Sequence, residues 1–423
     1  MRILRYDEPD FAAQLRKLQR QSEPHPEVEK TVRDVLHAVR TEGDSALLEF
    51  TEQFGGPRLT AKNLLVTGRP KVDARTKEAI ATAHANVLAF ARRSLRENWT
   101  MKNAQGALVG ERFDPFQRVG IYVPGGTAPL VSTAIMTCTL AQAAGCPEIV
   151  VSTPTGPDGE VNPALQHALH VAGATEVYRV GGAQAIAAMA YGTETIRPVQ
   201  KIFGPGNAYV VEAKRQTFGA VAIDLLPGPS EILVLADATA EPAWIAADLL
   251  AQAEHGKGSL MVFVTNSSKL LKAVEKAIDE QIQTLSRQEH LAGVLDSGAT
   301  LVLVKSMKDG VAIANDFAPE HVSIVAQDEE RLASAVHTAG AIFLGGYSPV
   351  AAGDFLSGPS HTLPTGGAGK SFPGLTVDMF QRRTSLVRLN DRSLKKSLAT
   401  IEAFSALEGL DAHGRSASVR FDK

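Results

Sequence analysis

The spacing of apolar residues changes along the chain, and over the first hundred residues it is helical. Apolar side chains recur every three or four residues over 28–39 and again over 80–95, which predicts two amphipathic helices. Pro24 and Pro26 precede the first series. They predict a short amino-terminal arm, separate from the rest of the chain.

Near residue 118 the pattern becomes that of a buried strand. The apolar run Val119–Val123 meets Gly125 and Gly126, and an alanine-rich apolar segment begins near Pro129. A strand, a glycine turn and a helix are therefore predicted.

The same order of strand and helix then recurs in two series. The first has expected strands at 149–151 and 176–180, with helices from about 163, over 183–190 and after 204–206. The second has expected strands at 232–235, 260–264, 301–304 and 322–325, with helices at 242–255 and 270–285. Alternation of this kind is typical of parallel α/β folds, so we expect two open sheets.

The last expected strand, 341–344, leads into a stretch rich in Gly, Ser and Pro over 345–374. Such a stretch is too long for an ordinary connection, which predicts a functional loop. A helix over about 392–407 and a small tail are expected to close the chain.

Composition narrows the class of protein further. The 423 residues are 44% hydrophobic, enough for roughly two to four domains with buried cores. A net charge of −3 offers no global attraction to nucleic acid or to anionic membranes, and no apolar run approaches the ~18 residues of a membrane span. Because Cys138 and Cys146 are the only cysteines, a disulfide framework is excluded and a reducing, cytoplasmic location is expected.

Two pairs of polar residues are candidates for chemistry. Gln252 and His255 are three residues apart at the end of a predicted helix, so both side chains point the same way. The alternative is a histidine that only complements the helix dipole. Glu320 and His321 precede a predicted apolar strand. They can share general-base work, or they can be a chance surface pair.

Further donors lie late in the chain. Asp354 and His361 fall within the glycine-rich stretch, and His413 follows Glu408 in the tail. Oxygen and nitrogen donors of this kind bind Zn2+ or a similar divalent ion. Four are available: Gln252, His255, Asp354 and His413.

Two glycine turns, at 125–126 and 204–207, each precede a predicted helix. Backbone amides there can face an anion such as a pyrophosphate, or the glycines can serve only a tight turn. Neither turn has the GxGxxG spacing of the standard dinucleotide fingerprint. The glycines of these turns therefore fit either a nucleotide site or a tight turn.

Taken in order, these motifs resemble those of one family, the histidinol dehydrogenases, over most of the chain. The segments that carry the resemblance are YVPGGTAP at 122–129, GGAQAIA at 181–187, KIFGPGN at 201–207, GPSE at 228–231, AQAEH at 251–255, PEH at 319–321, GD at 353–354 and HTLPT at 361–365, with His413 after them.

The resemblance implies a shared metal and substrate site. One Zn2+ per subunit is held by Gln252, His255, Asp354 and His413. The last of these ligands comes from the partner subunit, so a homodimer is required. L-Histidinol completes the zinc coordination, and the remaining substrate contacts implied are Ser230, His321, His361 and Glu408.

The resemblance also implies an NAD+-linked reaction. Tyr122, Gln184 and Asn207 match positions that touch NAD+. L-Histidinol is oxidised through its aldehyde to L-histidine, the last step of histidine biosynthesis, with two NAD+ per turnover. His321 would act as the base, and Glu320 would activate water.

In fold, the resemblance implies two large open-sheet Rossmann-like α/β domains without the GxGxxG fingerprint, with small terminal pieces involved in dimer contacts. The expected divisions are a helical arm at 1–25, a discontinuous domain at 26–121 and 231–375 carrying the metal and catalytic residues, an inserted NAD-contacting domain at 122–230, and a tail domain at 376–423 that reaches the partner subunit.

Other functions stay open beside this one. A paralogous dehydrogenase would keep the fold and oxidise another small polar alcohol. A zinc hydrolase in which Glu320 activates metal-bound water predicts turnover without NAD+, and a non-catalytic binding module predicts no turnover at all. Aldehyde oxidation through a thiol is disfavoured, because Cys138 and Cys146 fall in an apolar stretch with no nearby acid or histidine in sequence.

Overall fold

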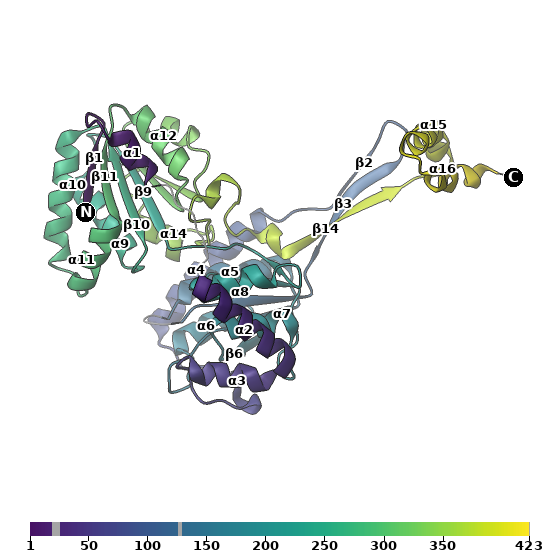
Figure 1. The fold of residues 1–423 in the computed structure, drawn as a ribbon, viewed down its shortest axis with the longest axis horizontal. Coiled ribbons are helices and arrows are strands. Elements are labelled where there is room, and N and C mark those ends of the chain that lie inside the picture. The colour runs from purple at the N-terminus through teal and green to yellow at the C-terminus, as the bar shows by residue number, and fades with distance from the viewer. Residues whose placement is uncertain (19–25, 126–128, 423) are drawn as a thin grey trace.

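The computed structural model describes residues 1–18, 26–125 and 129–422. It consists of two α/β lobes and one extended arm. In Figure 1 the six-stranded lobe lies at the left, the five-stranded lobe lies below the centre, and the arm reaches out to the carboxyl terminus. Pro24 and Gly126, which marked the predicted arm boundary and one glycine turn, lie outside the described residues.

The six-stranded lobe is built on a parallel sheet in the order β1-β11-β10-β9-β12-β13. Its strands are β1 (Arg2–Arg5), β9 (Glu231–Ala236), β10 (Leu260–Thr265), β11 (Ala299–Leu303), β12 (His321–Val325) and β13 (Ala341–Leu344). Strands β9 and β11 are buried along their whole length, because helices cover both faces of the sheet. One face is covered by α9 (Pro242–Ala253), α10 (Ser268–Ile282) and α11 (Gln288–Gly298), and the other by α1 (Phe11–Arg16), α12 (Met307–Phe317) and α13 (Glu329–Ser334).

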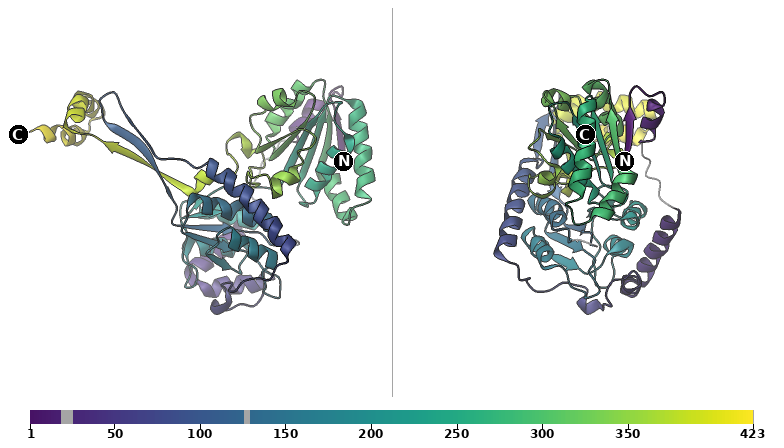
Figure 2. Two further views of the ribbon diagram at one scale, coloured as in Figure 1. Left: turned by 180° about the vertical axis from the view of Figure 1, so that it is seen from behind. Right: turned by 90° about the vertical axis from the view of Figure 1, so that its left-hand side faces the viewer.

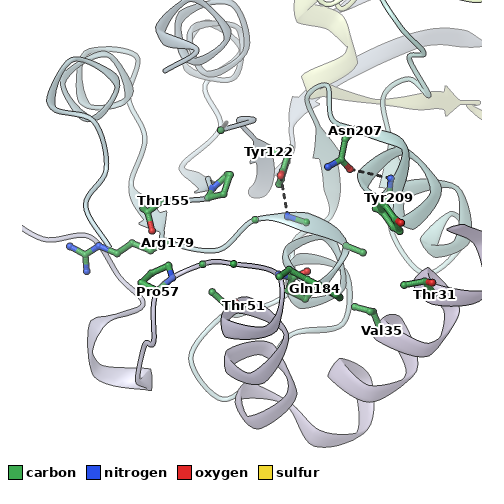
Figure 3. A pocket seen from close by; sticks show the side chains of 18 residues that line it. Thr31, Val35, Thr51, Pro57, Tyr122, Thr155, Arg179, Gln184, Asn207 and Tyr209 are labelled. Atoms are coloured by element: carbon green, nitrogen blue, oxygen red, sulfur yellow. Dashed lines mark hydrogen bonds between the residues drawn. The ribbon is translucent and has the colours of Figure 1, made fainter. Parts of the chain in front are cut away.

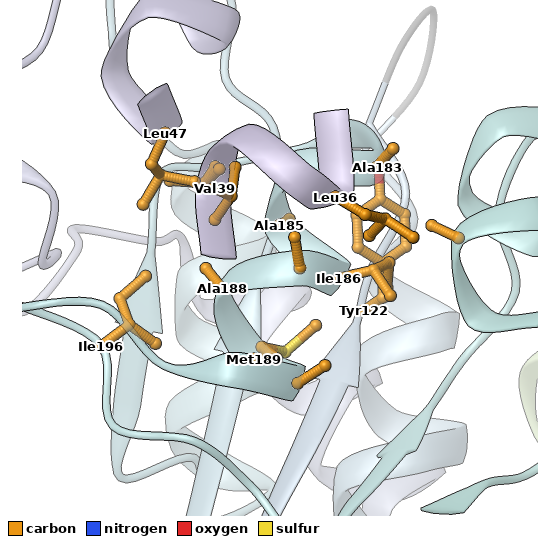
Figure 4. Packing of buried hydrophobic residues seen from close by; sticks show 14 of the residues in the cluster. Leu36, Val39, Leu47, Tyr122, Ala183, Ala185, Ile186, Ala188, Met189 and Ile196 are labelled. Atoms are coloured by element: carbon orange, nitrogen blue, oxygen red, sulfur yellow. The ribbon is translucent and has the colours of Figure 1, made fainter. Parts of the chain in front are cut away.

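The five-stranded lobe has a second parallel sheet, in the order β6-β5-β4-β7-β8. Its strands are β4 (Arg118–Tyr122), β5 (Glu148–Ser152), β6 (Glu176–Tyr178), β7 (Lys201–Phe203) and β8 (Ala222–Ile223). One face is covered by α2 (Pro26–Glu42), α3 (Asp44–Gln53), α7 (Gly182–Tyr191) and α8 (Ala208–Thr217), and the other by α4 (Ala74–Arg93), α5 (Val131–Ala144) and α6 (Pro163–Val171). Figure 4 shows how Leu36 and Val39 of α2 pack beside Ala185 of α7.

The arm combines two distant segments of the chain. Strands β2 (Trp99–Lys102), β3 (Leu108–Pro115) and β14 (Gln381–Arg388) form an antiparallel sheet in the order β14-β3-β2. The strands lead to α15 (Asp391–Glu408) and α16 (Asp411–Ser418), which pack on each other well away from both lobes (Figures 1 and 2). The remaining short elements are α14 (Val350–Phe355), η1 (Ala61–Asn63), η2 (Ala368–Lys370), η3 (Val377–Phe380) and η4 (Val419–Phe421). Within the described ranges, no helix is long and apolar enough to cross a membrane.

The expected pair of open α/β sheets is confirmed, but the amino terminus differs from the helical arm predicted at 1–25. Residues 2–5 form β1, which pairs in parallel with β11 and so becomes the edge strand of the six-stranded sheet. Helix α1 follows it. Four residues are too short for periodicity to identify a strand, and a strand about 300 residues away in sequence supplies the pairing.

The helices after residue 26 also group differently from the predicted domain at 26–121 and 231–375. Helices α2 and α3 share a hydrophobic cluster with α7 and α8, and α4 packs with α5 and α6. Helices α2, α3 and α4 therefore cover the five-stranded sheet. Residues 99–115 belong to the arm. Helical periodicity shows which face of a helix is apolar, but it does not show which sheet that face will cover.

Candidate active site

Glu320 and His321 stand at the start of β12, at the amino edge of the six-stranded sheet. Glu320 is 7% exposed. Its Oε2 accepts hydrogen bonds from Ser230 Oγ at 2.5 Å and from the Glu231 backbone N–H at 2.9 Å. Burial raises the pKa of Glu320 to about 7, although both hydrogen bonds act to lower it. The carboxyl group is therefore placed to exchange a proton near neutral pH.

The ring of His321 is held by its inner nitrogen. Nδ1 lies 2.9 Å from the Glu231 carbonyl oxygen. Because a carbonyl can only accept, Nδ1 carries the proton and Nε2 keeps its lone pair. Nε2 is buried and makes no hydrogen bond to any described residue, with Asp354 Oδ1 3.7 Å away. Burial lowers the pKa of His321, against the opposing effects of Asp354 and the Glu231 carbonyl, so the ring is neutral with a free basic nitrogen.

The glycine-rich stretch supplies Asp354 and His361, from α14 and the segment after it. Burial raises the pKa of Asp354 to about 6. His361 Nδ1 lies 3.1 Å from the Asp354 carbonyl oxygen, and its Nε2 lies 3.3 Å from Thr133 Oγ1 of α5. Burial lowers the pKa of His361 to about 4. Thr133 belongs to the five-stranded lobe, so this neutral ring joins the two lobes at the site.

Gln252 and His255 enter the site from the end of α9. Gln252 is 3% exposed, and its Nε2 has no hydrogen-bond partner in the part of the chain that is described. His255 lies just beyond the helix, at the surface, and its backbone N–H donates to the Gln252 carbonyl at 3.3 Å. Partial enclosure lowers the pKa of His255, and the nearby His321 adds to the effect. The partnerless amide of Gln252 marks a place where a further polar group fits.

The other two predicted site residues lie elsewhere. Glu408 and His413 are exposed on α15 and α16 of the arm, far from the lobes of the same chain (Figure 1). Accordingly, no three His, Cys, Asp or Glu side chains of the described residues converge as a metal cluster. Within one subunit the structure brings His255 and Asp354 close to His321, with Gln252 one helical turn before His255, and it leaves the tail residues apart.

A second site lies at the carboxyl edge of the five-stranded sheet, where a cavity of about 440 Å³ opens. Tyr122, Gln184 and Asn207 all line it (Figure 3). The Tyr122 hydroxyl accepts from the Gly182 N–H at 3.1 Å, and Asn207 caps α8 through its side-chain oxygen. Gln184 Oε1 is buried without a hydrogen-bond partner among the described residues.

Part of this cavity comes from residues that the sequence motifs missed. Thr31 and Val35 of α2, Thr51 of α3, the turn at 54–57 and Arg179 contribute to its lining. All of these except Arg179 precede the first strand of the sheet by about 60 residues or more in sequence. The amphipathic pattern of α2 shows that one face of this helix is buried, but it does not show that the helix packs beside this cavity or which of its residues face it.

The two cysteines take no part in either site. Cys138 lies within α5, Cys146 lies just beyond its end, and both are buried. Burial raises the pKa of each thiol to about 12, so neither is a thiolate at neutral pH. This environment agrees with the expectation that aldehyde oxidation does not use a thiol.

Known proteins are similar to this chain in sequence and in fold. The sequence profile described as "Histidinol dehydrogenase" matches residues 18–421. The histidinol dehydrogenase of Syntrophotalea carbinolica is 42% identical, with 99% of each chain covered, and that of Haloarcula marismortui is 44% identical, with 93% of this chain and 94% of the relative covered.

Solved structures agree. A crystal structure of histidinol dehydrogenase from Elizabethkingia anophelis superposes with a TM-score of 0.93 at 32% identity, covering 100% of this chain and 98% of the other. An acetylating aldehyde dehydrogenase from Geobacillus thermoglucosidasius shares the fold alone, with a TM-score of 0.51 at 16% identity and 89% and 94% of the two chains covered. The chain is therefore an α/β enzyme of the oxidoreductase class. More specifically, it belongs to the histidinol dehydrogenase family.

Proposed function

We propose that this chain oxidises L-histidinol to L-histidine, the last step of histidine biosynthesis, using Zn2+ and two NAD+ per turnover. The observation that carries the proposal is the pairing of a neutral His321, whose Nε2 is free, with a buried Glu320 whose pKa lies near 7. The substrate is taken from the relatives, because the chain spans nearly their whole length.

The first oxidation needs a base for the alcohol proton. His321 Nε2 accepts this proton, while the bond from Nδ1–H to the Glu231 carbonyl keeps the ring in the required tautomer. Bound NAD+ supplies the hydride acceptor for both oxidations. Tyr122, Gln184 and Asn207 would contact it, because all three line the cavity, and the partnerless Oε1 of Gln184 suits a donor on the nucleotide.

The second oxidation consumes one water. Glu320 in its ionised form takes a proton from this water as the water oxygen adds to the aldehyde carbon, and the carbonyl oxygen takes the proton that His321 gained in the first oxidation, which gives the hydrate. His321, neutral again, takes a proton from the hydrate as the second hydride departs, and Glu320 releases its proton to solvent. Ser230 Oγ donates to the Glu320 carboxylate at 2.5 Å and so keeps it oriented. The net change is four electrons removed and two NADH formed.

Zn2+ would be held by Gln252, His255 and Asp354 of one subunit and by His413 of the partner subunit. Gln252 is buried, and because its Nε2 has no partner among the described residues, the amide is free to turn its oxygen toward a divalent ion held by the oxygen and nitrogen donors of Asp354 and His255. When bound there, the metal would supply positive charge to hold the imidazole and amine of the substrate and so fix the alcohol carbon. His361 and Glu408 would complete the substrate contacts.

A homodimer would bring the arm of one subunit to the site of the other. The arm exposes apolar side chains that its own chain leaves uncovered, such as Leu407, 82% exposed, and Phe404, 59% exposed. Exposed apolar patches of this kind mark protein interaction surfaces. Removal of residues 390–423 should yield monomers by size-exclusion chromatography and abolish turnover. A truncated chain that remains dimeric would contradict this role of the arm.

The decisive experiment is the number of NADH formed per L-histidinol consumed, followed to completion by absorbance for the zinc-loaded wild type and for His321→Ala. Two NADH per histidinol, with loss of turnover in the variant, is the expected result. One NADH would mean that oxidation stops at the aldehyde. If the enzyme forms no NADH from histidinol but oxidises another small polar alcohol, the substrate is different and the proposed mechanism still applies.

A further inference from the structure

A fully buried ion pair lies behind the glycine turn of the nucleotide cavity. Lys214 of α8 and Asp224, which follows β8, form this pair, and both side chains are 0% exposed. Lysine and aspartate are almost never buried so completely unless they are paired. Neither residue lines the cavity, and neither takes part in the chemistry proposed above.

Both members of the pair bind the backbone of one residue, Gly204. Lys214 Nζ donates to the Gly204 carbonyl oxygen at 2.9 Å. The Gly204 N–H donates to Asp224 Oδ2 at 2.7 Å, and Lys214 also bonds Asp224 Oδ1. Because Gly204 is buried, these two polar groups would otherwise be unsatisfied at considerable cost in free energy.

The conformation of Gly204 explains why its backbone groups bond to charged side chains. Gly204 directly follows β7 and has φ +108°, in the region that glycine alone adopts readily. A Cβ here would lie 2.1 Å from the Tyr122 carbonyl oxygen. The turn thus passes against the end of β4, and its polar groups are bonded by the ion pair instead of by a neighbouring strand.

This turn determines where the cavity wall lies. Three residues after Gly204, Asn207 caps α8 by accepting from the backbone N–H groups of Tyr209 and Val210, each at 3.1 Å. Asn207 and Tyr122 both line the cavity. Lys214 lies on α8 itself, so the ion pair ties the turn to the same helix whose amino end faces the cavity.

We propose that Lys214 and Asp224 are positioning residues for the nucleotide, acting through Gly204. They hold the 204–207 turn in the conformation that presents Asn207 and the first amides of α8 to NAD+. This proposal rests on the proposed function in taking NAD+ as the occupant of the cavity. General stability does not account for the pair, because a buried ion pair is often no more stabilising than apolar residues of similar volume.

The test is the double variant Lys214→Met/Asp224→Leu, which removes both charges together and so leaves neither one buried alone. Its melting temperature without NAD+ should fall, because the Gly204 N–H and carbonyl oxygen lose their partners. Its KM for NAD+ should rise by about tenfold or more, with kcat at saturating NAD+ close to wild type. A given rise in melting temperature should require about tenfold more NAD+ than in the wild type.

A matched control lies at the opposite edge of the same sheet. Glu176→Gln weakens the ion pair with Arg118, which lies 6% exposed at the start of β4. This control should lower the melting temperature and leave the KM for NAD+ unchanged. An equal rise in KM in the control would mean that any damage to the lobe has the same effect, which would overturn the proposal.

An unchanged KM for NAD+ in a folded double variant would also overturn it. If the double variant does not fold, Lys214→Gln/Asp224→Asn decides the question, since it also removes both charges, changes the shape less and should still raise the KM for NAD+. Failure of the proposed function is separable: wild type would then make no NADH from histidinol. In that case the rise in melting temperature on addition of NAD+ can still be compared between wild type and the variants. If NAD+ does not raise the melting temperature of the wild type, both proposals are overturned.

Discussion

The two lobes place their polar sites at opposite edges of their parallel sheets. In the five-stranded lobe the cavity opens at the carboxyl edge, where Tyr122 ends β4 and Asn207 precedes α8. In the six-stranded lobe, Glu320 and His321 stand at the amino edge, where β12 begins, beside the carboxyl end of α9. Only the first arrangement follows the general rule that ligands bind beyond the carboxyl ends of the strands.

The difference is physical, because the two ends of a helix carry opposite partial charge. Helices α7 and α8 begin at the cavity, and the free amides of a helix amino end favour an anion such as a pyrophosphate. Helix α9 ends at the other site, and a helix carboxyl end favours a cation. The two edges therefore suit different ligands, in agreement with the proposed NAD+ and Zn2+. The cavity of the five-stranded lobe presents neutral backbone and side-chain amides, whereas the site of the six-stranded lobe presents titratable side chains.

The strongest test of this division removes the base. His321→Asn should lower kcat by roughly 10²–10⁴-fold, the usual worth of a general base, with little change in the KM for NAD+. The matched control is His84→Asn, since the His84 ring bonds Gln142 2.8 Å away, at the far end of α5 from Thr133. Initial rates of NADH formation measure both. If the variant retains more than about a tenth of wild-type kcat, His321 is not the general base.

A smaller loss is expected from Glu320→Gln, which keeps the oxygen that Ser230 and the Glu231 N–H reach but removes the base for water. Turnover should fall by about 10²-fold or more, and the NADH formed per histidinol should drop from two toward one as aldehyde is released. In wild type the second oxidation should weaken as pH falls below about 7, because Glu320 is then protonated. Two NADH per histidinol in the variant would assign the hydration step to another group.

In the five-stranded lobe the effect should be on binding instead. Gln184→Ala removes the partnerless Oε1 from the cavity and should raise the KM for NAD+ by about tenfold with kcat within about twofold. Gln142→Ala is the matched control, because its amide bonds His84 outside the cavity. Steady-state kinetics with varied NAD+ separate the two parameters. A fall in kcat without a rise in the KM for NAD+ would contradict the assignment of NAD+ binding to this lobe.

The smallest effect concerns stability. The pKa of Glu320 is raised from 4.5 to about 7 in the folded state, so the contribution of this carboxyl to stability is present below pH 4.5 and is lost as pH rises through about 7. Glu320→Gln should therefore melt a few degrees above wild type at about pH 8 and close to it at about pH 4.5. Thermal denaturation at both pH values measures this. A variant less stable than wild type at the higher pH would show that the ionised carboxylate is well stabilised in the free enzyme.

Much of the fold could be predicted because its strands and helices are local patterns. The apolar runs at 119–123 and 232–235 predicted β4 and β9, and the strand-turn-helix order predicted two parallel sheets. Strand β1 and the arm strands β2, β3 and β14 were missed. Strands β1 and β2 are four residues long, β14 is mostly exposed, and β3 is half-buried along most of its length. None of their sequences has the regular apolar alternation that identifies a strand.

For the sites, the residue types and motifs can be read from the amino-acid sequence, and their resemblance to one family identified the candidates. How these residues group in space depends on contacts between distant parts of the folded chain. Folding places α2 against the five-stranded sheet, brings His361 to Thr133 across the lobes, and sets Glu408 and His413 on an arm far from the lobes of their own chain. The physical reason is range: periodicity and capping act within a few turns of the chain, whereas burial, pKa and the partners of a polar group depend on residues hundreds of positions away.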